Sequence, residues 1–374
     1  MRILTITNCP LDPRLGSGTT VIRFAGGLRQ LGHEVDVLAP HDYELGRGIR
    51  VAKQLRQGFG ASRAIRDRLA NRPYDLVEFY GAEFWPAIGR LARARRRPLL
   101  VAHTNGLELL NYEREAAYHP ARGLKVAASR SVHRLLFTRS FRETDAFVAL
   151  CEADRDWVVN HRLYDPSMTA VVPPAPDEAF RTAAAAAAVH KENRVAFIGS
   201  WTERKGIDTI AAVMHAVLRA DPQVVFDVFG ASANAPAVAA SFDPAVRDRV
   251  QVHGSLEPAS LAAAVARAKV FFFPSQYEGY GLALIEAMMS GLAVVTTPTG
   301  LGAELSAAEA MVCGFDDRDA MRRAIERLLH DETLRASLAA QGRRRAAALS
   351  WEDSARKLAA LYENWLAGRI RRMS

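Results

Sequence analysis

Short apolar runs alternate with longer amphipathic stretches along most of the chain. Such alternation is typical of β-α-β units, in which amphipathic helices cover both faces of a parallel sheet. Thr19–Leu31, for example, has apolar residues at helical spacing and stops at Gly32, a residue type that often ends helices. The apolar runs predict strands at Ile3–Thr7, Val35–Leu38, Leu76–Phe79, Leu99–Ala102, Ala146–Leu150, Ala170–Val172, Val195–Ile198, Val224–Phe229, Val250–His253, Val270–Phe273 and Ala293–Thr296.

The alternation is interrupted at Val172-Pro-Pro-Ala-Pro-Asp177, where three prolines fall within four residues. Proline continues neither a helix nor a central strand, so this segment predicts a stiff connection. The alternation then starts again at Arg194, and 374 residues exceed what one hydrophobic core usually serves. We therefore expect two doubly wound α/β domains, residues 1–172 and 191–350, joined by a linker at 173–190. A final helix with one buried face is predicted from Trp351, Leu358, Leu361, Tyr362 and Trp365.

Cysteine spacing, apolar runs and charge exclude several classes of protein. The three cysteines lie far apart without a Cys-x-x-Cys pair, which argues against a disulfide scaffold or a cysteine zinc cluster and fits a reducing compartment. There is no apolar run of about 18 residues and no signal-peptide pattern at the start, so we expect a cytoplasmic protein. The net charge is +8, and only six of the 49 basic residues are lysines. Either GC-rich coding explains the arginines, or the protein has an anionic partner.

The segment Pro274–Gly291 follows a predicted strand and combines glycines with two glutamates. Gly279 and Gly281 let a ligand approach the backbone, and the helix that follows offers free N–H groups to an anion. Glu278 and Glu286 lie eight residues apart, and a carboxylate there can accept hydrogen bonds from two adjacent hydroxyls, such as a ribose diol. The alternative is an ordinary glycine turn with acidic residues at a helix start.

Two other segments follow the first predicted strand of each domain. In the second domain, Gly199-Ser-Trp-Thr-Glu-Arg-Lys-Gly206 places Lys205 at a helix start, where a lysine can meet a phosphate. In the first domain, Gly16-Ser-Gly18 also opens a helix, but the full Gly-x-Gly-x-x-Gly fingerprint of dinucleotide sites is missing. Open parallel sheets bind ligands at the carboxyl ends of their strands, so both segments are candidate ligand contacts.

His103 ends a predicted strand and has two explanations. It either hydrogen-bonds a ligand or is a structural histidine. Asp154-Arg-Asp156 and Asp317-Arg-Asp319 fall in polar, helix-like stretches, so we interpret these aspartates as solvated and not as metal ligands. No Walker, His-Glu-x-x-His or Gly-x-Ser-x-Gly sequence occurs, so P-loop phosphoryl transferases, zinc proteases and serine hydrolases have no support.

Together these motifs resemble the retaining glycosyltransferases of the GT-B fold, family 4. The family has the pattern Pro-Ser-x-x-Glu-Gly-Phe-Gly-Leu-x-x-x-Glu-Ala-x-x-x-Gly-x-Pro-Val-Val. This chain matches it from Pro274 to Val295, except that Tyr280 replaces the Phe and Ala293 replaces the Pro before Val-Val. Thr299–Glu304, Leu31-Gly-His-Glu-Val and Ser350-Trp also resemble family segments, so the resemblance covers nearly the whole chain. It implies two Rossmann-like domains facing a central cleft. The N-terminal domain would bind the acceptor, the C-terminal domain the nucleotide-sugar donor, and residues 351–374 would pack back on the N-terminal domain.

The resemblance also implies roles for single residues. Lys205 would bind the distal phosphate of the donor, Glu286 the ribose hydroxyls and Glu278 the hydroxyls of the donor sugar. His103 would lie near the transferred sugar and is, with Lys205 and Glu278, a candidate catalytic residue. No metal and no other cofactor is expected, because lysine, arginine and the helix dipole would stabilise the leaving diphosphate. The other expected donor contacts are Gly16, Gly18, Gly199, Arg204, Ser275, Gly279, Tyr280, Gly281 and Leu282.

Two departures from the family pattern concern the donor site and the hinge. The family often has an arginine after the first glycine of the lysine loop, where this chain has Ser200. Either Arg204 substitutes for it or the site carries one cation fewer. The family's Pro-Asn-Gly-Val-Asp at the domain junction is here Pro173-Pro-Ala-Pro-Asp177, which predicts a stiffer hinge.

The implied reaction is transfer of a sugar from a nucleotide diphosphate sugar to a hydroxyl, with retention, in the assembly of cell-envelope or extracellular polysaccharide or glycolipid. The acceptor is a glycan, a lipid-linked molecule or a small molecule. Arg93–Arg97 and Arg130–Arg142 are basic stretches that either contact an anionic membrane, as in a peripheral protein on the inner face of the cell membrane, or form solvated helix faces.

Three alternative functions agree with the site residues and the charge of this chain to different degrees. A small-molecule glycosyltransferase shares every donor residue. A sugar-nucleotide epimerase of the same fold is disfavoured by the spacing of Glu278 and Glu286. A nucleic-acid-binding protein would fit the charge, but no reading module is visible, so no nucleic-acid partner is expected.

Overall fold

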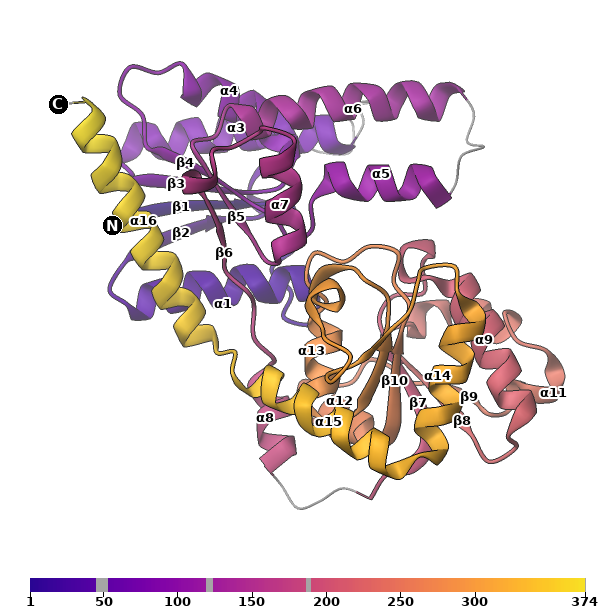
Figure 1. The fold of residues 1–374 in the computed structure, drawn as a ribbon. Helices are drawn as coiled ribbons and strands as arrows, with labels where there is room; N and C mark the ends of the chain where they lie inside the picture. Colours follow the sequence, from indigo (N-terminus) through magenta and orange to yellow (C-terminus); the bar gives the residue numbers. More distant parts are fainter. Residues whose placement is uncertain (45–52, 119–123, 186–189, 374) are drawn as a thin grey trace. The chain divides into compact units, whose positions relative to one another are not determined.

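The computed structural model describes residues 1–44, 53–118, 124–185 and 190–373. The chain divides into two compact units, which we call unit 1 (Met1–Pro174 with Trp351–Ser374) and unit 2 (Ala175–Ser350). Each unit contains a six-stranded sheet in which neighbouring strands run parallel, with helices on both faces (Figure 1). The predicted α/β class with two doubly wound parallel sheets is therefore confirmed.

The sheet of unit 1 has the strand order β2-β1-β3-β4-β5-β6. Its strands supply alternate apolar side chains to both faces, so Ile6, Val77 and Phe79 are almost fully buried beneath the helices. The elements are β1 (Arg2–Thr7), α1 (Gly16–Gln30), β2 (Glu34–Leu38), α2 (Pro40–Tyr43), α3 (Lys53–Asn71), β3 (Leu76–Tyr80), η1 (Ala82–Phe84), α4 (Trp85–Ala92), β4 (Leu99–His103), α5 (Glu108–Tyr118), α6 (Leu124–Arg142), β5 (Ala146–Ala149), α7 (Glu152–Asn160), η2 (Pro166–Met168), β6 (Thr169–Val171) and α16 (Trp351–Met373).

The sheet of unit 2 has the order β12-β11-β10-β7-β8-β9. Its central strands are nearly continuous runs of apolar residues, as expected for strands covered on both faces. The elements are α8 (Glu178–Ala185), β7 (Glu192–Ile198), η3 (Glu203–Lys205), α9 (Ile207–Ala220), β8 (Val225–Phe229), η4 (Ser232–Asn234), α10 (Ala235–Ala240), α11 (Pro244–Arg247), β9 (Val250–Val252), α12 (Pro258–Ala266), β10 (Ala268–Phe273), α13 (Leu282–Met289), β11 (Ala293–Thr296), η5 (Gly300–Glu304), β12 (Met311–Val312), α14 (Arg318–His330) and α15 (Glu332–Ala347).

Every predicted strand coincides with an observed strand, with ends that agree to within three residues. The sequence did not indicate β12, which has two residues and pairs with the edge of the sheet at β11. Two residues are too few to show alternation, so this strand left no pattern to detect.

The segment predicted as a linker, 173–190, is largely part of unit 2. The division between the units falls after Pro174, among the three prolines. The helix α8 follows and packs against α12 and α13, with Phe180 only 2% exposed. Residues 186–189 lie outside the described residues. The stiff connection is therefore shorter than the composition suggested.

The long helix α16 belongs to unit 1, although the chain reaches it after passing through unit 2. It packs against α1, where the absence of a side chain at Gly27 admits the methyl group of Ala355. Leu358 and Tyr362 on its predicted face are fully buried. None of the helices in the described part of the chain is both long and apolar enough to cross a membrane.

Candidate functional site

The glutamate motif forms a strand, loop and helix at the carboxyl edge of the unit 2 sheet. The apolar strand β10 ends at Phe273, and α13 begins at Leu282. Gly281 precedes this helix with φ 97°, a left-handed conformation that glycine adopts without strain. Ser275, Tyr280 and the other residues of this loop are buried, except Gln276, which is half-buried. The loop is therefore held in one conformation by its own packing.

Lys205 and Glu278 form a buried ion pair in this loop region. Lys205 Nζ donates to Glu278 Oε1 at 2.6 Å, and the two residues are 9% and 7% exposed. Arg204 lies 3.7 Å from the same carboxylate oxygen and donates a hydrogen bond to the carbonyl of Tyr277 at 3.0 Å. Lys205 Nζ also lies 4.7 Å from the centre of the Phe273 ring. Two cations and one anion thus meet in a small, partly apolar space.

The pKa values of this pair follow from burial and mutual attraction. Burial lowers the pKa of Lys205. The negative charge of Glu278 opposes this shift, and the positive charge of Arg204 increases it. Burial alone would raise the pKa of Glu278, but the positive charges of Lys205 and Arg204 hold that pKa below its usual value. Glu278 is therefore a carboxylate near neutral pH, stabilised by the basic side chains beside it.

The lysine loop is fixed against the glutamate loop by backbone contacts. Gly206 has φ +74°, and a Cβ atom there would lie 2.3 Å from the carbonyl oxygen of Pro274. The backbone N–H of Gln276 donates to the carbonyl of Arg204 at 2.9 Å. Gly199 leaves room for the aliphatic part of Lys205, since a Cβ atom would lie 3.4 Å from Lys205 Cε. The structure therefore brings the lysine loop and the glutamate loop of unit 2 together.

Glu286 lies half-buried on α13, next to the start of unit 2 at Asp177. Burial and the nearby Asp177 raise the pKa of Glu286 to about 8, while a hydrogen bond from the Asp177 backbone opposes the shift. The sequence did not mark Asp177 as a neighbour of this site. Thr299 was also missed, and its hydroxyl accepts a hydrogen bond from the backbone N–H of Glu278 at 2.9 Å.

Gly16 and Gly18 lie in the first turn of α1 in unit 1. Gly18 has a packing reason to be glycine, because a Cβ atom would lie 2.6 Å from the carbonyl oxygens of Pro10 and Asp12. The preceding loop thus crosses close over the helix start. That these glycines contact the donor stays a prediction.

His103 ends β4 and is 1% exposed, in the interior of unit 1. Its Nε2 lies 2.5 Å from the hydroxyl of Tyr362 on α16, and its ring stacks on Tyr80 at 4.4 Å. A structural role fits the contacts of Nε2 and of the ring, whereas Nδ1 has no hydrogen-bond partner among the described residues. A catalytic role for His103 stays a prediction.

The interpretation of Asp154 as solvated is wrong. Asp154 is 1% exposed and accepts a hydrogen bond from the backbone N–H of Leu107 at 3.2 Å. Because α7 starts directly after β5, its first turn faces the carboxyl edge of the sheet. Burial and the nearby Glu83 and Asp154 raise the pKa of Glu108 to about 8.

Metal ligands were not expected from either aspartate pair. Asp317 accepts a hydrogen bond from the backbone N–H of Ala320 and so caps α14. Among the described residues, no group of three or more His, Cys, Asp or Glu side chains could hold a metal ion.

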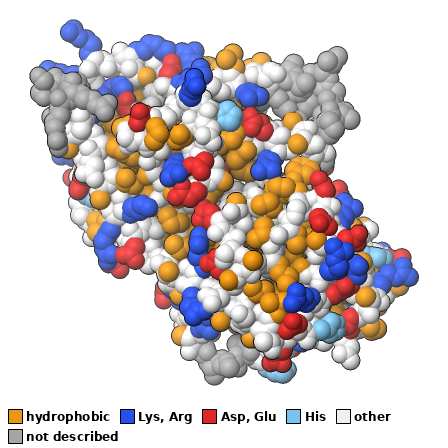
Figure 2. Space-filling model, in the orientation of Figure 1, with side chains coloured by type: hydrophobic (Ala, Val, Ile, Leu, Met, Phe, Trp, Pro, Cys, Tyr) orange, Lys and Arg blue, Asp and Glu red, His pale blue; other side chains and the backbone are white. Residues whose placement is uncertain are grey.

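The basic stretches of unit 1 are partly paired with acidic residues. Arg97 forms two hydrogen bonds with Asp145, at 2.5 and 2.7 Å, so it is not available to a membrane. Arg93 and Arg139 both contact Glu143. On α6 the side chains of Val132 and Leu135 are 57% and 71% exposed, while that of Arg130 lies outside the described residues. Figure 2 shows acidic and basic side chains interspersed over the visible face.

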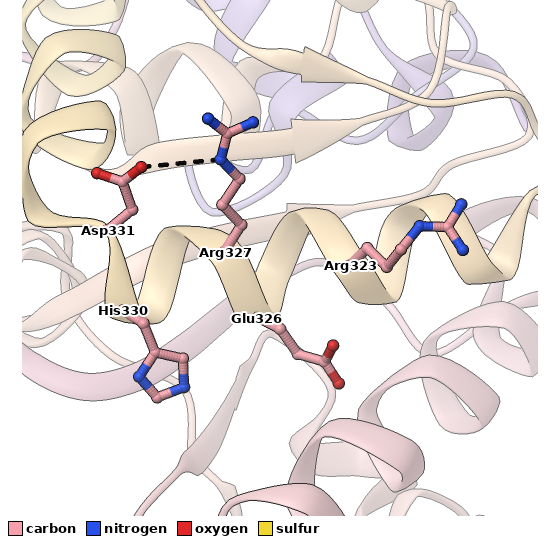
Figure 3. Close-up of a pocket in the computed structure, with 5 residues that line it drawn as sticks. All are labelled: Arg323, Glu326, Arg327, His330 and Asp331. Atoms are coloured by element: carbon pink, nitrogen blue, oxygen red, sulfur yellow. Dashed lines mark ion pairs between the residues drawn. The ribbon is translucent and has the colours of Figure 1, made fainter.

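A shallow hollow on α14 lies away from this site (Figure 3). The nearby carbonyl of Leu329 accepts a hydrogen bond from Lys269, the second residue of β10, so the hollow is at the amino edge of the unit 2 sheet. The Lys205–Glu278 pair lies at the opposite, carboxyl edge. The side chains that line the hollow are Arg323, Glu326, Arg327, His330 and Asp331, of which Arg327 and Asp331 form an ion pair at 3.7 Å.

Comparison with known proteins agrees with this geometry. Residues 15–180 match the family model Glycosyltransferase Family 4, and residues 180–345 match Glycosyl transferases group 1. D-inositol 3-phosphate glycosyltransferase of Segniliparus rotundus is 31% identical over 60% of this chain, and the match spans 54% of that relative's length. Phosphatidyl-myo-inositol mannosyltransferase of Mycolicibacterium smegmatis is 25% identical over 97% of this chain and 94% of that one.

A solved structure extends the comparison to the whole fold. Sucrose-phosphate synthase from Thermosynechococcus elongatus superimposes with a TM-score of 0.79 at 21% identity, over 98% of this chain and 99% of that chain. At this identity the likeness concerns the fold alone, and both sheets take part in it. The chain belongs to the glycosyltransferases of the GT-B fold, with a family 4 N-terminal part and a group 1 C-terminal part.

Proposed function

We propose that this glycosyltransferase moves a sugar from a nucleotide diphosphate sugar to an acceptor hydroxyl and retains the anomeric configuration. The observation that carries the proposal is the buried pair of Lys205 and Glu278, 2.6 Å apart and beside the start of α13. Lys205 and Arg204 supply positive charge, and a helix N-terminus favours an anion. A diphosphate is an anion of the right kind for this position, and Glu278 can accept hydrogen bonds from sugar hydroxyls.

The main energetic demand of the reaction is the negative charge that develops on the departing diphosphate. Electrostatic groups aimed at such a charge are worth about 3–4 kcal/mol each when removed. In the proposal Lys205, Arg204 and the amides of α13 provide this stabilisation, and no metal is required. The bond from the anomeric carbon to the phosphate oxygen breaks, the bond to the acceptor oxygen forms on the same face, and the leaving phosphate takes the acceptor's proton.

The donor half of the proposal is tested by nucleotide binding. UDP, GDP, TDP, ADP and CMP are compared by thermal shift and calorimetry, with EDTA and with Mg²⁺. One nucleotide should stabilise the protein with or without metal, because stabilisation grows with the logarithm of ligand concentration over Kd. Lys205→Ala and Glu286→Ala should abolish this effect, whereas Lys357→Ala, on an exposed part of α16, should not. Binding of none of the nucleotides, or binding only with Mg²⁺, would contradict the proposal.

The proposed retention of the anomeric configuration is tested on the reaction product. With the nucleotide that binds, the matching sugar donors are incubated with candidate acceptors, and the anomeric configuration of the product is read by NMR. The proposal requires the configuration of the donor; an inverted product overturns it. Epimerisation of the sugar nucleotide without acceptor would favour the rival epimerase.

For the acceptor we favour a lipid-linked glycan or glycolipid at an anionic membrane, reached by a peripheral, cytoplasmic protein in cell-envelope or extracellular polysaccharide assembly. Two observations support this choice. A relative with nearly full coverage is named as acting on phosphatidyl-myo-inositol. On α6, Val132 and Leu135 are strongly exposed beside Arg134 and Arg139.

The membrane interaction has a direct test with a matched control. Vesicles with acidic lipid should retain the protein at low salt, and neutral vesicles should not. Replacing Val132 and Leu135 by serine should weaken this retention, whereas Val312→Ser, which removes an exposed apolar side chain in unit 2, should leave it unchanged. Equal recovery with both kinds of vesicle would favour a small-molecule acceptor.

A further inference from the structure

A chain of hydrogen bonds inside unit 1 links His103 to the C-terminal helix. Glu78, in the middle of β3, is 2% exposed and accepts hydrogen bonds from Thr5 on β1, at 2.5 Å, and from the hydroxyl of Tyr362 on α16. The same hydroxyl lies 2.5 Å from Nε2 of His103. His103 and Tyr362 are 259 positions apart in the sequence, so the network exists only in the folded unit.

Counting protons fixes the direction of these hydrogen bonds when Glu78 is a carboxylate. A carboxylate only accepts, so Thr5 and Tyr362 each donate to it. The phenol of Tyr362 has a single proton, which it donates in the hydrogen bond to Glu78. Its oxygen must therefore accept a hydrogen bond from His103. Burial lowers the pKa of His103 to about 3, so the ring is neutral and carries one proton. That proton sits on Nε2, and Nδ1 keeps a free lone pair.

The free Nδ1 of His103 has no hydrogen-bond partner among the described residues, although the side chain is fully buried. Buried polar atoms without partners are rare in native proteins. This one belongs to the last residue of β4, and open parallel sheets bind ligands at the carboxyl ends of their strands. Stacking on Tyr80 and an edge contact with Tyr362 hold the plane of the ring. A ligand hydroxyl would supply the missing partner.

We propose that Glu78 and Tyr362 are positioning residues that hold His103 with Nδ1 as a hydrogen-bond acceptor for a hydroxyl group of the sugar substrate. The proposal rests on the proposed sugar transfer, and it adds that the C-terminal helix takes part in arranging the site. Tyr362 and Glu78 act through His103 and do not touch the substrate themselves.

The first test is Tyr362→Phe, which removes one oxygen atom. The proton on Nε2 then loses its acceptor, and the nearest remaining one is Glu78 Oε1 at 3.6 Å, so the ring is free to turn or change tautomer. The kcat of sugar transfer should fall about tenfold to a hundredfold, as expected for a misplaced group near the reacting atoms. The Kd of the nucleoside diphosphate alone should stay within about twofold, since the donor phosphate contacts lie in unit 2.

Tyr164→Phe is the matched control. It also removes a buried tyrosine hydroxyl of unit 1, which lies 2.5 Å from that of Thr144. It should leave kcat unchanged. If Tyr362→Phe loses no more activity than Tyr164→Phe, the proposal is wrong.

A double-mutant cycle separates positioning from a general structural effect. Tyr362→Phe should reduce kcat in the wild-type background and have no further effect in a His103→Ala background, because the group that it positions is then absent. If the loss of kcat in the double variant equals the product of the losses in the two single variants, the proposal is wrong. Unchanged nucleotide binding in all four proteins excludes damage to the donor site.

The tautomer can be read without any activity. In ¹⁵N-labelled protein at pH 8 and above, the His103 signals, identified by their loss in His103→Ala, should show a protonated Nε2 and a bare Nδ1. Tyr362→Phe should disturb this pattern, and Tyr164→Phe should not. A proton on Nδ1 of the wild type would refute the arrangement even if the sugar transfer itself were confirmed. Failure of the proposed function would instead appear as absence of transfer with the ¹⁵N pattern intact.

Discussion

Each unit buries a glutamate, and the two lie in opposite surroundings. In unit 2, Glu278 pairs with Lys205 at 2.6 Å, and the cations around it hold its pKa below the usual value. In unit 1, the polar groups that contact Glu78 among the described residues are hydroxyls and a neutral histidine, and burial raises its pKa to about 7. The two units share a fold but differ in how they accommodate a buried carboxyl group.

The difference bears on the roles proposed above for the two units. A buried carboxylate is stabilised by a counter-charge or by donated hydrogen bonds, and otherwise it takes up a proton. In the proposed function, Lys205 and Arg204, which contact Glu278 in this structure, would contact the diphosphate of the donor instead. A neutral network of hydroxyls and a histidine has no charge to offer, but it provides directed hydrogen bonds for sugar hydroxyls. Electrostatics, and not the shared fold, therefore distinguish the surroundings of the two glutamates.

The largest expected effect compares Glu→Gln at the two positions. Glu278→Gln leaves Lys205 buried without its counter-charge and should lower the free energy of unfolding by about 3–5 kcal/mol. Glu78→Gln keeps hydrogen-bonding atoms among neutral partners and should cost about 1 kcal/mol or less at pH 7. Urea unfolding of both variants measures this difference. Equal losses would show that the two environments are not electrostatically distinct.

Lys205→Ala tests the same contrast through activity. Removal of the cation should reduce kcat/KM about a hundredfold to a thousandfold and should also weaken binding of the nucleoside diphosphate. His103→Ala, in unit 1, should reduce transfer but leave nucleotide binding unchanged. Steady-state kinetics and calorimetry on both variants separate the two roles. A Lys205→Ala variant with near-normal turnover would remove this lysine from the mechanism.

The two glutamates should also give stability opposite dependences on pH. The folded-state pKa of Glu78 is raised from 4.5 to about 7, so its contribution is present below pH 4.5 and is lost as the pH rises through about 7. This loss is at most about 3 kcal/mol. The groups facing Glu78 are Thr5, Tyr362, His103 and Tyr80, and none is cationic near neutral pH.

Glu278 has a lowered folded-state pKa, so its contribution is present above the unfolded-state pKa and is lost as the pH falls. Unfolding free energies of the wild type minus those of each Glu→Gln variant, measured between pH 3 and 8, isolate the two terms, because the Glu278 term changes below pH 4.5 and the Glu78 term between pH 4.5 and about 7. The difference should fall with rising pH for Glu78 and rise for Glu278. Parallel slopes would contradict the comparison.

The candidate donor residues of unit 2 stand out in the sequence because they are close together along the chain. The glutamates, the glycines of the loop and the start of α13 lie within Pro274–Gly291, and Lys205 belongs to a second short motif. The hydroxyl network of unit 1 joins β1, β3, β4 and α16. Its members show no common spacing, so only the fold reveals that His103 meets Tyr362.

Two errors have a similar origin. Asp154 looked solvated because its neighbours are polar, but its position directly after β5 turns it toward the edge of the sheet. The linker looked long because the alternation of apolar runs and amphipathic stretches starts again only at Arg194, whereas α8, which lies within it, packs on α12 and α13 of unit 2. Local composition does not show which face of a short helix meets a neighbour.

The smallest expected effect compares a glycine at the start of α9 in unit 2 with one in the first turn of α1 in unit 1. At Gly206, alanine would adopt φ +74° and place its Cβ atom 2.3 Å from the carbonyl oxygen of Pro274, in a buried loop. Gly291→Ala has a similar φ of +70° with nothing within 4 Å, so it measures the backbone strain alone, about 1 kcal/mol.

Gly18→Ala brings a close contact, 2.6 Å to Pro10 and Asp12, but no positive φ, and the loop it meets is partly exposed and can shift. The loss in unfolding free energy should therefore be greatest for Gly206→Ala, about 2–3 kcal/mol. Gly206→Ala should also weaken nucleotide binding, because Lys205 moves with its neighbour, whereas Gly291→Ala should not. If Gly18→Ala destabilised the protein as much as Gly206→Ala, the loop of unit 1 would be as rigid as the lysine loop, and the contrast between the units would be confined to charge.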